Sequence, residues 1–120
     1  MKVSKFNDVI TKLLSEKLKQ FNDKKLDLVI CVEIYQEIFG SLVEVFEQSE
    51  AGLTNEAMNY LAQQYYDAIL INGKEELDPN IFTQRASMDN IETKELALLA
   101  VMLNGTDFAI PLINEVKRRS

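Results

Sequence analysis

Apolar side chains recur at intervals of three and four residues along most of the chain, which is the pattern of amphipathic α-helices. The first such segment covers residues 3–21, with lysines between the apolar positions. The second covers residues 26–48; it opens on a β-branched run but keeps helical spacing in its later half. Each segment therefore predicts one long helix, and the polar residues 22–25 separate the two.

Boundary residues indicate three further helices. Thr54 is placed to cap a helix over residues 54–71, and Thr93 to cap another over residues 93–103. A last helix is expected to open at Thr106-Asp107, with its inward apolar positions and a proline in its first turn. The inward positions of this last helix are Phe108, Leu112, Ile113 and Val116, and the proline is Pro111.

The least regular stretch is residues 72–90, which is longer than ordinary connections between bundled helices. Within it, Asp78-Pro79 looks like a helix cap followed by proline at the first helical position. Phe82 and Ser87 are candidate anchors, and Arg85 is expected to pair with the acidic middle of the chain.

These segments predict an all-α fold, a compact bundle of about five helices with one longer irregular loop. The chain has 120 residues, the size of one domain, and shows no internal repeat or linker, so residues 1–120 are expected to form a single helical domain.

Composition narrows the possible chemistry. The chain has no histidine, which removes the commonest general base at neutral pH and nearly every zinc or transition-metal site. Its one cysteine, Cys31, lies in an apolar segment and is expected to be inert and buried. With no apolar run of bilayer length and no signal-peptide pattern, a cytoplasmic protein is expected, without a membrane or a cofactor as partner.

Charge is unevenly distributed. Residues 1–25 carry seven lysines and three acidic residues, whereas residues 26–84 carry one lysine and eleven acidic residues. Residues 85–120 balance, and the whole chain has a net charge of -6. The acidic middle repels phosphate backbones, so nucleic acid is not expected as the main ligand.

Four glutamates in the second helical segment fall within an arc of about 80° and form one acidic stripe that also includes a glycine. The stripe could be a solvated face paired with lysines of the first helix, a surface for a basic protein partner that approaches closely at the glycine, or a divalent-metal site. The stripe consists of Glu33, Glu37, Gly40, Glu44 and Glu47.

The metal alternative is linked to a resemblance. Glu44-x-x-Glu47, followed by Gln64-x-x-Asp67, loosely resembles the ExxE…ExxD motif of the all-α nucleotide pyrophosphohydrolases. The resemblance implies helix-borne carboxylates that hold magnesium against a triphosphate. The chain departs from the motif at Gln64, where the family has glutamate.

The segment Leu96–Leu103 is apolar at all eight positions. Such a helix is either central and wrapped by the others, or it turns its outer side to a second copy of the chain; a ligand groove is a third alternative. The expected oligomer interface consists of Leu96, Leu99, Val101, Leu103, Phe108 and Leu112.

Two further groups of side chains have alternative interpretations. Tyr65 is expected to face the core, with Tyr60 and Tyr66 on the flanks of their helix, either half-buried or as a recognition surface. The basic residues 117–119 are expected to stay solvated at the end of the last helix.

Taken together, these features favour a protein–protein interaction or accessory module over an enzyme. The expected state is a homodimer, and the expected partner is a basic protein. The alternative is a magnesium-dependent nucleotide pyrophosphohydrolase of the all-α type.

Overall fold

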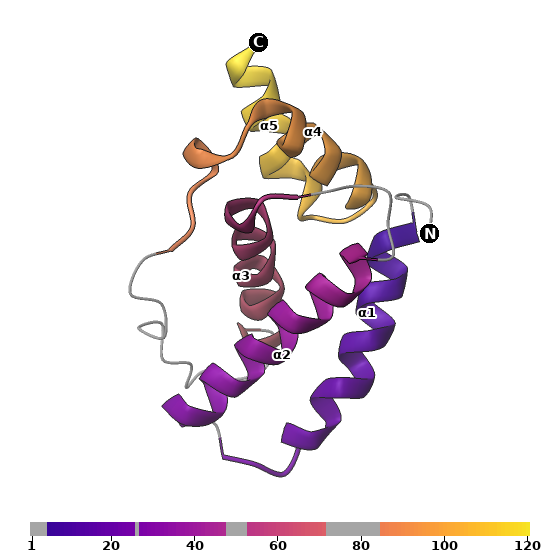
Figure 1. Cartoon of the computed structure of the whole chain (residues 1–120), viewed down its shortest axis with the longest axis vertical. Coiled ribbons are helices and arrows are strands. Elements are labelled where there is room, and N and C mark those ends of the chain that lie inside the picture. The colour runs from indigo at the N-terminus through magenta and orange to yellow at the C-terminus, as the bar shows by residue number, and fades with distance from the viewer. Residues whose placement is uncertain (1–4, 26, 48–52, 72–84) are drawn as a thin grey trace.

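The computed structural model describes residues 5–25, 27–47, 53–71 and 85–120, with the main chain alone at 69–71. The predicted all-α bundle of about five helices is confirmed (Figure 1). Its elements are α1 (Phe6–Lys17), η2 (Leu18–Phe21), α2 (Leu28–Glu47), α3 (Asn55–Ile71), η4 (Met88–Asn90), α4 (Thr93–Met102) and α5 (Ala109–Arg119), where η marks a short 3-10 helix.

The predicted extents of the first three helices agree with the structure where it describes them. Residues 3–21 become α1 followed by the tighter η2, and the β-branched opening of the second segment is helical in α2. The Asp27 carboxylate accepts a hydrogen bond from the Ile30 N–H at 2.9 Å, and the Thr54 hydroxyl accepts one from the Ala57 N–H at 3.3 Å. Both helix starts therefore have a capping side chain.

The last two helices begin differently from the prediction. Thr93 is the first residue of α4 rather than its cap, and Glu92 precedes it without a side-chain capping bond. The Thr106 hydroxyl donates to the Leu103 carbonyl at 2.7 Å and closes the turn after α4, where Gly105 has a φ of +89°. The fifth helix consequently begins only at Ala109, and its proline does fall in the first turn.

Two predicted features of the irregular stretch, Asp78-Pro79 and Phe82, lie outside the described residues. So do the ends of the predicted ranges at residues 3–4, 26 and 48.

Helix α2 is amphipathic, with one side in the core and one side open. Its buried side includes Cys31, which is 1% exposed and has a free thiol, as predicted. Although α2 is the longest of the described helices, neither it nor any other of them is apolar enough over a sufficient length to cross a membrane.

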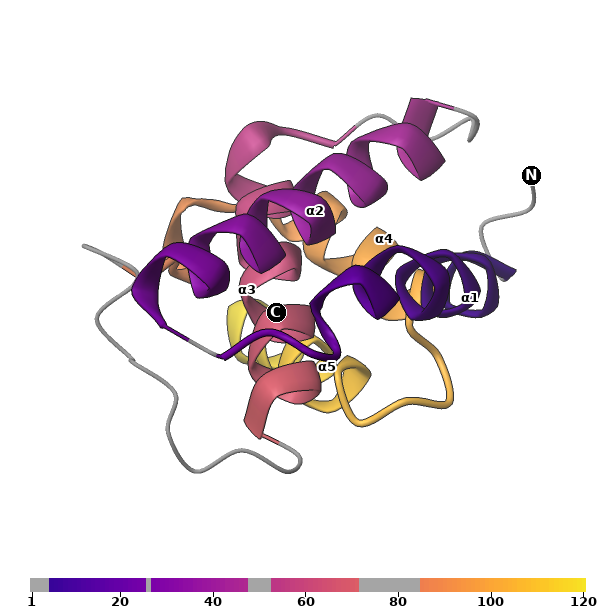
Figure 2. The same cartoon turned by 90° about the horizontal axis from the view of Figure 1, so that it is seen from below.

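The central helix of the bundle is α3. It passes between the α1–α2 pair and the α4–α5 pair (Figures 1 and 2), and nearly all of its residues from 57 to 66 are buried. The predicted flank positions Tyr60 and Tyr66 are buried together with Tyr65, so the alternative of a tyrosine recognition surface is wrong.

The more apolar α4 lies nearer the surface. Its side chains Leu96, Leu99 and Met102 are buried, but Val101 is 56% exposed. The interpretation of α4 as the helix wrapped by all the others is therefore wrong, because α4 packs mainly against α5 and keeps an open side.

Polar side chains of α3 are bound by the helices on either side. The Tyr65 hydroxyl donates to the Asn7 side-chain oxygen of α1 at 2.7 Å, and the Tyr35 hydroxyl of α2 donates to the Asn59 side-chain oxygen. Burial raises the pKa of both Tyr65 and Tyr35 above the usual tyrosine value. Both phenols are therefore neutral donors at physiological pH.

The N-terminus of α3 is linked to α4. The buried Glu95 carboxylate accepts a hydrogen bond from the Thr54 N–H at 3.0 Å and another from the Thr54 hydroxyl at 3.2 Å. A carboxylate at a helix N-terminus also interacts favourably with the helix dipole.

Two contacts attach the segment after the undescribed loop to α3. The Ala86 N–H donates to the buried Gln63 side-chain oxygen at 2.9 Å, and Arg85 forms an ion pair with Asp67. The expected pairing of Arg85 with the acidic middle of the chain is confirmed.

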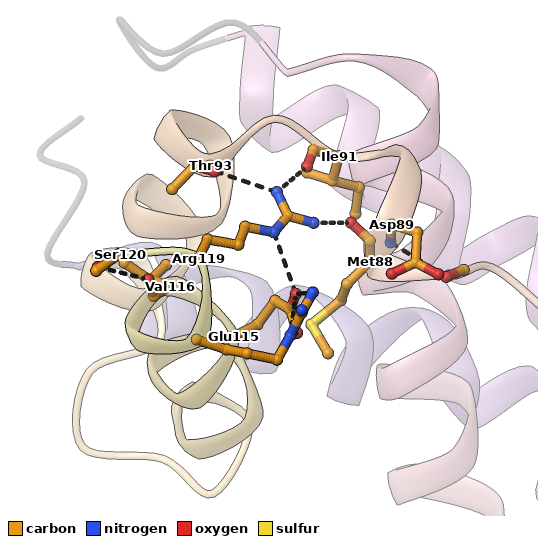
Figure 3. Close-up of polar contacts among 10 residues, drawn as sticks. Met88, Asp89, Ile91, Thr93, Glu115, Val116, Arg119 and Ser120 are labelled. Carbon is orange, nitrogen blue, oxygen red and sulfur yellow. Dashed lines mark hydrogen bonds and ion pairs between the residues drawn. The ribbon is translucent and has the colours of Figure 1, made fainter.

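The side chain of Arg119 holds the other side of this segment (Figure 3). It donates from one terminal nitrogen to the Ile91 carbonyl at 2.6 Å and to the Thr93 hydroxyl at 3.2 Å. The other terminal nitrogen donates to the Met88 carbonyl at 2.6 Å, and Nε donates to Glu115 at 3.1 Å. One guanidinium thus binds four acceptors and joins α5 to η4 and to the start of α4.

The expectation that residues 117–119 stay solvated is wrong for Arg119, whose side chain is only 19% exposed, and holds for Arg118 at 66%. Hydrogen bonding from Arg118, with a further contribution from Arg119, lowers the pKa of Glu115 to about 2. The carboxylate therefore stays charged as an acceptor for Arg119 throughout the physiological range.

We predict that Arg119→Lys lowers the free energy of unfolding by about 2 kcal/mol, because one ammonium cannot reach the carbonyls of Met88 and Ile91 in the same geometry. Chemical denaturation of the two proteins measures the difference. The matched control is Arg118→Lys, which changes an exposed pair and should alter stability by less than about 0.5 kcal/mol. Equal effects of the two substitutions would contradict the anchoring role.

Candidate functional site

A groove of about 700 Å³ lies between α2 and the start of α3. We call it the α2–α3 groove. Its α2 wall consists of Tyr35, Gln36, Phe39 and Gly40, and its α3 wall of Asn55, Glu56 and Asn59.

Two aromatic rings of the α2 wall, Tyr35 and Phe39, form the floor of the groove and are fixed in place. The Tyr35 and Phe39 rings lie 6.3 Å apart between centroids, and Tyr35 meets the buried Tyr66 ring edge-on at 6.2 Å. The hydrogen bond from Tyr35 to Asn59 ties the two walls together. Both floor rings are only partly buried, so they present an apolar surface that a ligand can contact.

Gly40 opens the groove at its α2 edge. Apart from the neighbouring residues and backbone of its own helix, nothing in the described part of the chain lies within 4 Å of the position that a Cβ would take at Gly40. Packing within this part of the chain therefore does not require glycine here, although glycine inside a helix costs about 0.5–1 kcal/mol relative to alanine. The open backbone leaves space for a close approach from outside.

The acidic stripe runs along the same edge, since Gly40 belongs both to the stripe and to the groove. Three of its glutamates are exposed and one is partly exposed. The sequence-based expectation of pairing with the first helix is confirmed at one position, where the Lys17 ammonium lies 3.0 Å from the Glu44 carboxylate. Glu33, Glu37 and Glu47 have no ion-pair partner among the described residues.

The apolar side of α2 continues beyond the groove toward the start of the helix. Leu28 lies seven residues before Tyr35, two helical turns away on the same side, and is half exposed. Val29 beside it is also exposed. An apolar strip therefore extends along α2 from the aromatic rings to Leu28, whereas Val29 lies on the side of the acidic stripe.

The three carboxylates of the pyrophosphohydrolase motif are not brought together among the described residues. Glu44 pairs with Lys17, and Asp67 pairs with Arg85. Across the described ranges, which include all four motif positions, no three side chains of the types that bind metals are grouped closely enough to hold an ion. The resemblance therefore does not extend from the sequence to the geometry of a site.

The predicted oligomer interface is divided by the fold. Four of its six side chains lie in the core of the single chain and cannot reach a partner in this conformation; they are Leu96, Leu99, Leu103 and Leu112. Phe108 is partly buried against the Tyr65 ring, with 5.0 Å between centroids. Of the predicted set, only Val101 is exposed, at 56%.

The open apolar residues of α5 were not all recognised from the sequence. Ile110 is 56% exposed, and Ile113, which was expected to face inward, is 39% exposed. Helical spacing is a signal for Ile110, which lies about 160° around α5 from the buried Leu112, but not for Ile113, which follows the buried Ala109 by four residues and flanks the same side.

A second hollow of about 180 Å³ adjoins the groove, and we call it the polar pocket. Two of its residues are also groove residues, and the others come from the segment attached to α3 and from η4. Only the folded contacts of that segment bring the residues together, so sequence spacing gives no signal of the pocket. Its lining residues are Glu56, Asn59, Arg85, Ala86, Ser87 and Asn90.

Comparison of the chain with protein-family models, curated proteins and solved structures gives no match.

Proposed function

We propose that this protein is an interaction module that binds a basic, amphipathic helix of another protein in the α2–α3 groove. The observation that supports the proposal is the position of Gly40, where an aromatic-floored groove meets an acidic stripe. A helix that lies in a groove between two helices is a recurrent mode of peptide recognition.

The apolar face of such a partner has a matching surface. Tyr35 and Phe39 offer half-buried rings, and Leu28 extends the apolar strip by two turns along α2. Apolar residues at helical spacing on the partner can follow this strip, and the missing side chain at Gly40 allows the two helices to approach closely.

The charge of the surface favours a basic partner over an acidic one. Glu33, Glu37 and Glu47 lie on the same side of α2 as Gly40, and Glu56 stands on the α3 wall of the groove. None of the four has an ion-pair partner in the part of the chain that the structure describes. Lysines or arginines that flank the apolar face of the bound helix would complement these carboxylates and raise the association rate.

The first test uses a synthetic amphipathic helix of leucine and lysine, roughly 18 residues or five turns long. We expect micromolar binding at low salt, with NMR shift changes concentrated on the groove residues of α2 and α3. Gly40→Leu should weaken binding at least tenfold, since a Cβ at this position meets no neighbouring side chain within 4 Å and the rest of the leucine would occupy the groove.

Two controls accompany this test. Gly40→Ala should raise the free energy of unfolding by about 0.5–1 kcal/mol, which shows that the position tolerates a side chain. A leucine–glutamate peptide of the same length should not bind. Equal binding of the acidic and basic peptides, or no binding of the basic one, would contradict the proposal.

We also propose that the chain forms homodimers through the exposed apolar residues of α4 and α5, because Val101, Ile110 and Ile113 are large and open to solvent on two adjacent helices. Sedimentation at micromolar concentration should give about twice 13.7 kDa. Val101→Glu should dissociate the dimer without unfolding it, because the side chain is already mostly exposed. The control is Val9→Glu on α1, outside the proposed interface, which should leave the dimer intact. A monomeric wild type would overturn this proposal.

Divalent metal ions distinguish the binding module from the alternative of a magnesium-dependent hydrolase. We predict that millimolar Mg²⁺ or Mn²⁺ leaves the melting temperature unchanged, since a metal that does not bind the native state does not stabilise it. Thermal melts with and without the ions make the measurement. A clear rise that disappears in Glu44→Gln would favour the hydrolase instead.

A further inference from the structure

The polar pocket differs from the groove in chemistry and origin. Four of its residues come from the stretch 85–90, which two contacts fasten to α3. We propose that this pocket receives one lysine side chain of the helix bound in the groove, and so determines which basic helices bind; this inference rests on the proposed function.

The size of the pocket suits a single side chain. Its volume of about 180 Å³ is below the roughly 300–1,000 Å³ of pockets that enclose a whole small molecule. It adjoins the groove through the shared residues Glu56 and Asn59, so a chain lying in the groove passes its entrance.

The lining suits an ammonium group. Glu56 supplies a carboxylate without an ion-pair partner in the described ranges, and the side chains of Ser87 and Asn90 supply further oxygen acceptors. The positive charge of Arg85 is countered by its ion pair with Asp67. An ammonium with three donors can therefore bind Glu56 and at least one neutral oxygen at the same time.

The walls of the pocket are already in place without a ligand. Gln63 holds the Ala86 main chain from the α3 side, and Arg119 holds the Met88 carbonyl from the α5 side. The Ser87 hydroxyl accepts a hydrogen bond from the Asp89 N–H at 3.1 Å, which fixes the start of η4. A lysine entering the pocket therefore orders few additional side chains, which favours selective binding.

A double-mutant cycle tests the inference with the leucine–lysine peptide. Each lysine of the peptide is replaced in turn by norleucine, which keeps the aliphatic stem and removes the charge. The peptides are titrated against the wild type, Glu56→Gln and Glu47→Gln. Glu56 lies on the shared wall, and Glu47 is an exposed member of the acidic stripe.

We expect Glu56→Gln to weaken binding about tenfold, as for the loss of a hydrogen bond to a charged group. At one lysine position of the peptide, and only one, the replacement by norleucine should no longer weaken binding when the protein carries Glu56→Gln. Glu47→Gln should weaken binding by about threefold or less, with no dominant position. The NMR amide shifts of Ser87 and Asn90 should change on binding only when the peptide carries that same lysine.

The two proposals fail in different ways. If the wild type binds the peptide and Gly40→Leu prevents binding, but no lysine couples to Glu56 more strongly than to Glu47, the pocket inference is overturned and the groove proposal stands. If norleucine at one position strengthens binding, the pocket rejects cations and the inference is also overturned. If the wild type does not bind the basic peptide, the groove proposal fails, and the pocket inference fails with it.

Discussion

The fold depends on the polar side chains of α3, a helix that the other elements enclose. A buried polar group without a hydrogen bond is costly, so a central helix that carries such groups must find a partner on each side. Tyr65 binds Asn7 of α1, Asn59 binds Tyr35 of α2, and Gln63 binds the main chain at Ala86. Glu95 of α4 completes the set at the N-terminus of α3. These directional contacts determine how the elements are placed, where apolar packing alone would tolerate other arrangements.

The same contacts place the candidate site. Asn59 holds Tyr35 in the floor of the α2–α3 groove and also lines the polar pocket, while Gln63 holds the main chain that forms the far wall of that pocket. Arg119 supports this wall from α5. Both hollows are therefore bounded by side chains that also maintain the bundle, which makes their shape a property of the whole fold.

Much of the helical framework could be predicted from the sequence, because the periodic spacing of apolar residues and the capping residues of helices are local properties. Residues such as Thr54 act on main-chain groups a few positions away, so their role can be recognised without knowing the fold. The central helix could not be identified in this way. The apolar run in α4 indicates that its side chains avoid water, but it does not show which helix the others surround, and the less apolar α3 takes that place.

The candidate site was predictable only in part, because sequence patterns show local spacing and not the contacts between distant residues. The acidic stripe follows from spacing within α2, whereas the pocket wall requires contacts across the chain such as Arg119 with Met88. A residue like Arg119, charged and at the end of a helix, has an ordinary local role that conceals its distant partners.

The burial of Cys31 has a practical consequence. It is the only thiol in the chain and lies in the core beneath α2, so a reagent can modify it only when α2 separates from the bundle. The labelling rate of the unmodified protein therefore reports the opening equilibrium of the helix that forms one wall of the groove. A ligand in the groove that binds only the closed form slows labelling by the factor 1 + [L]/Kd. The labelling rate of Cys31 therefore measures how much of the protein has its groove occupied.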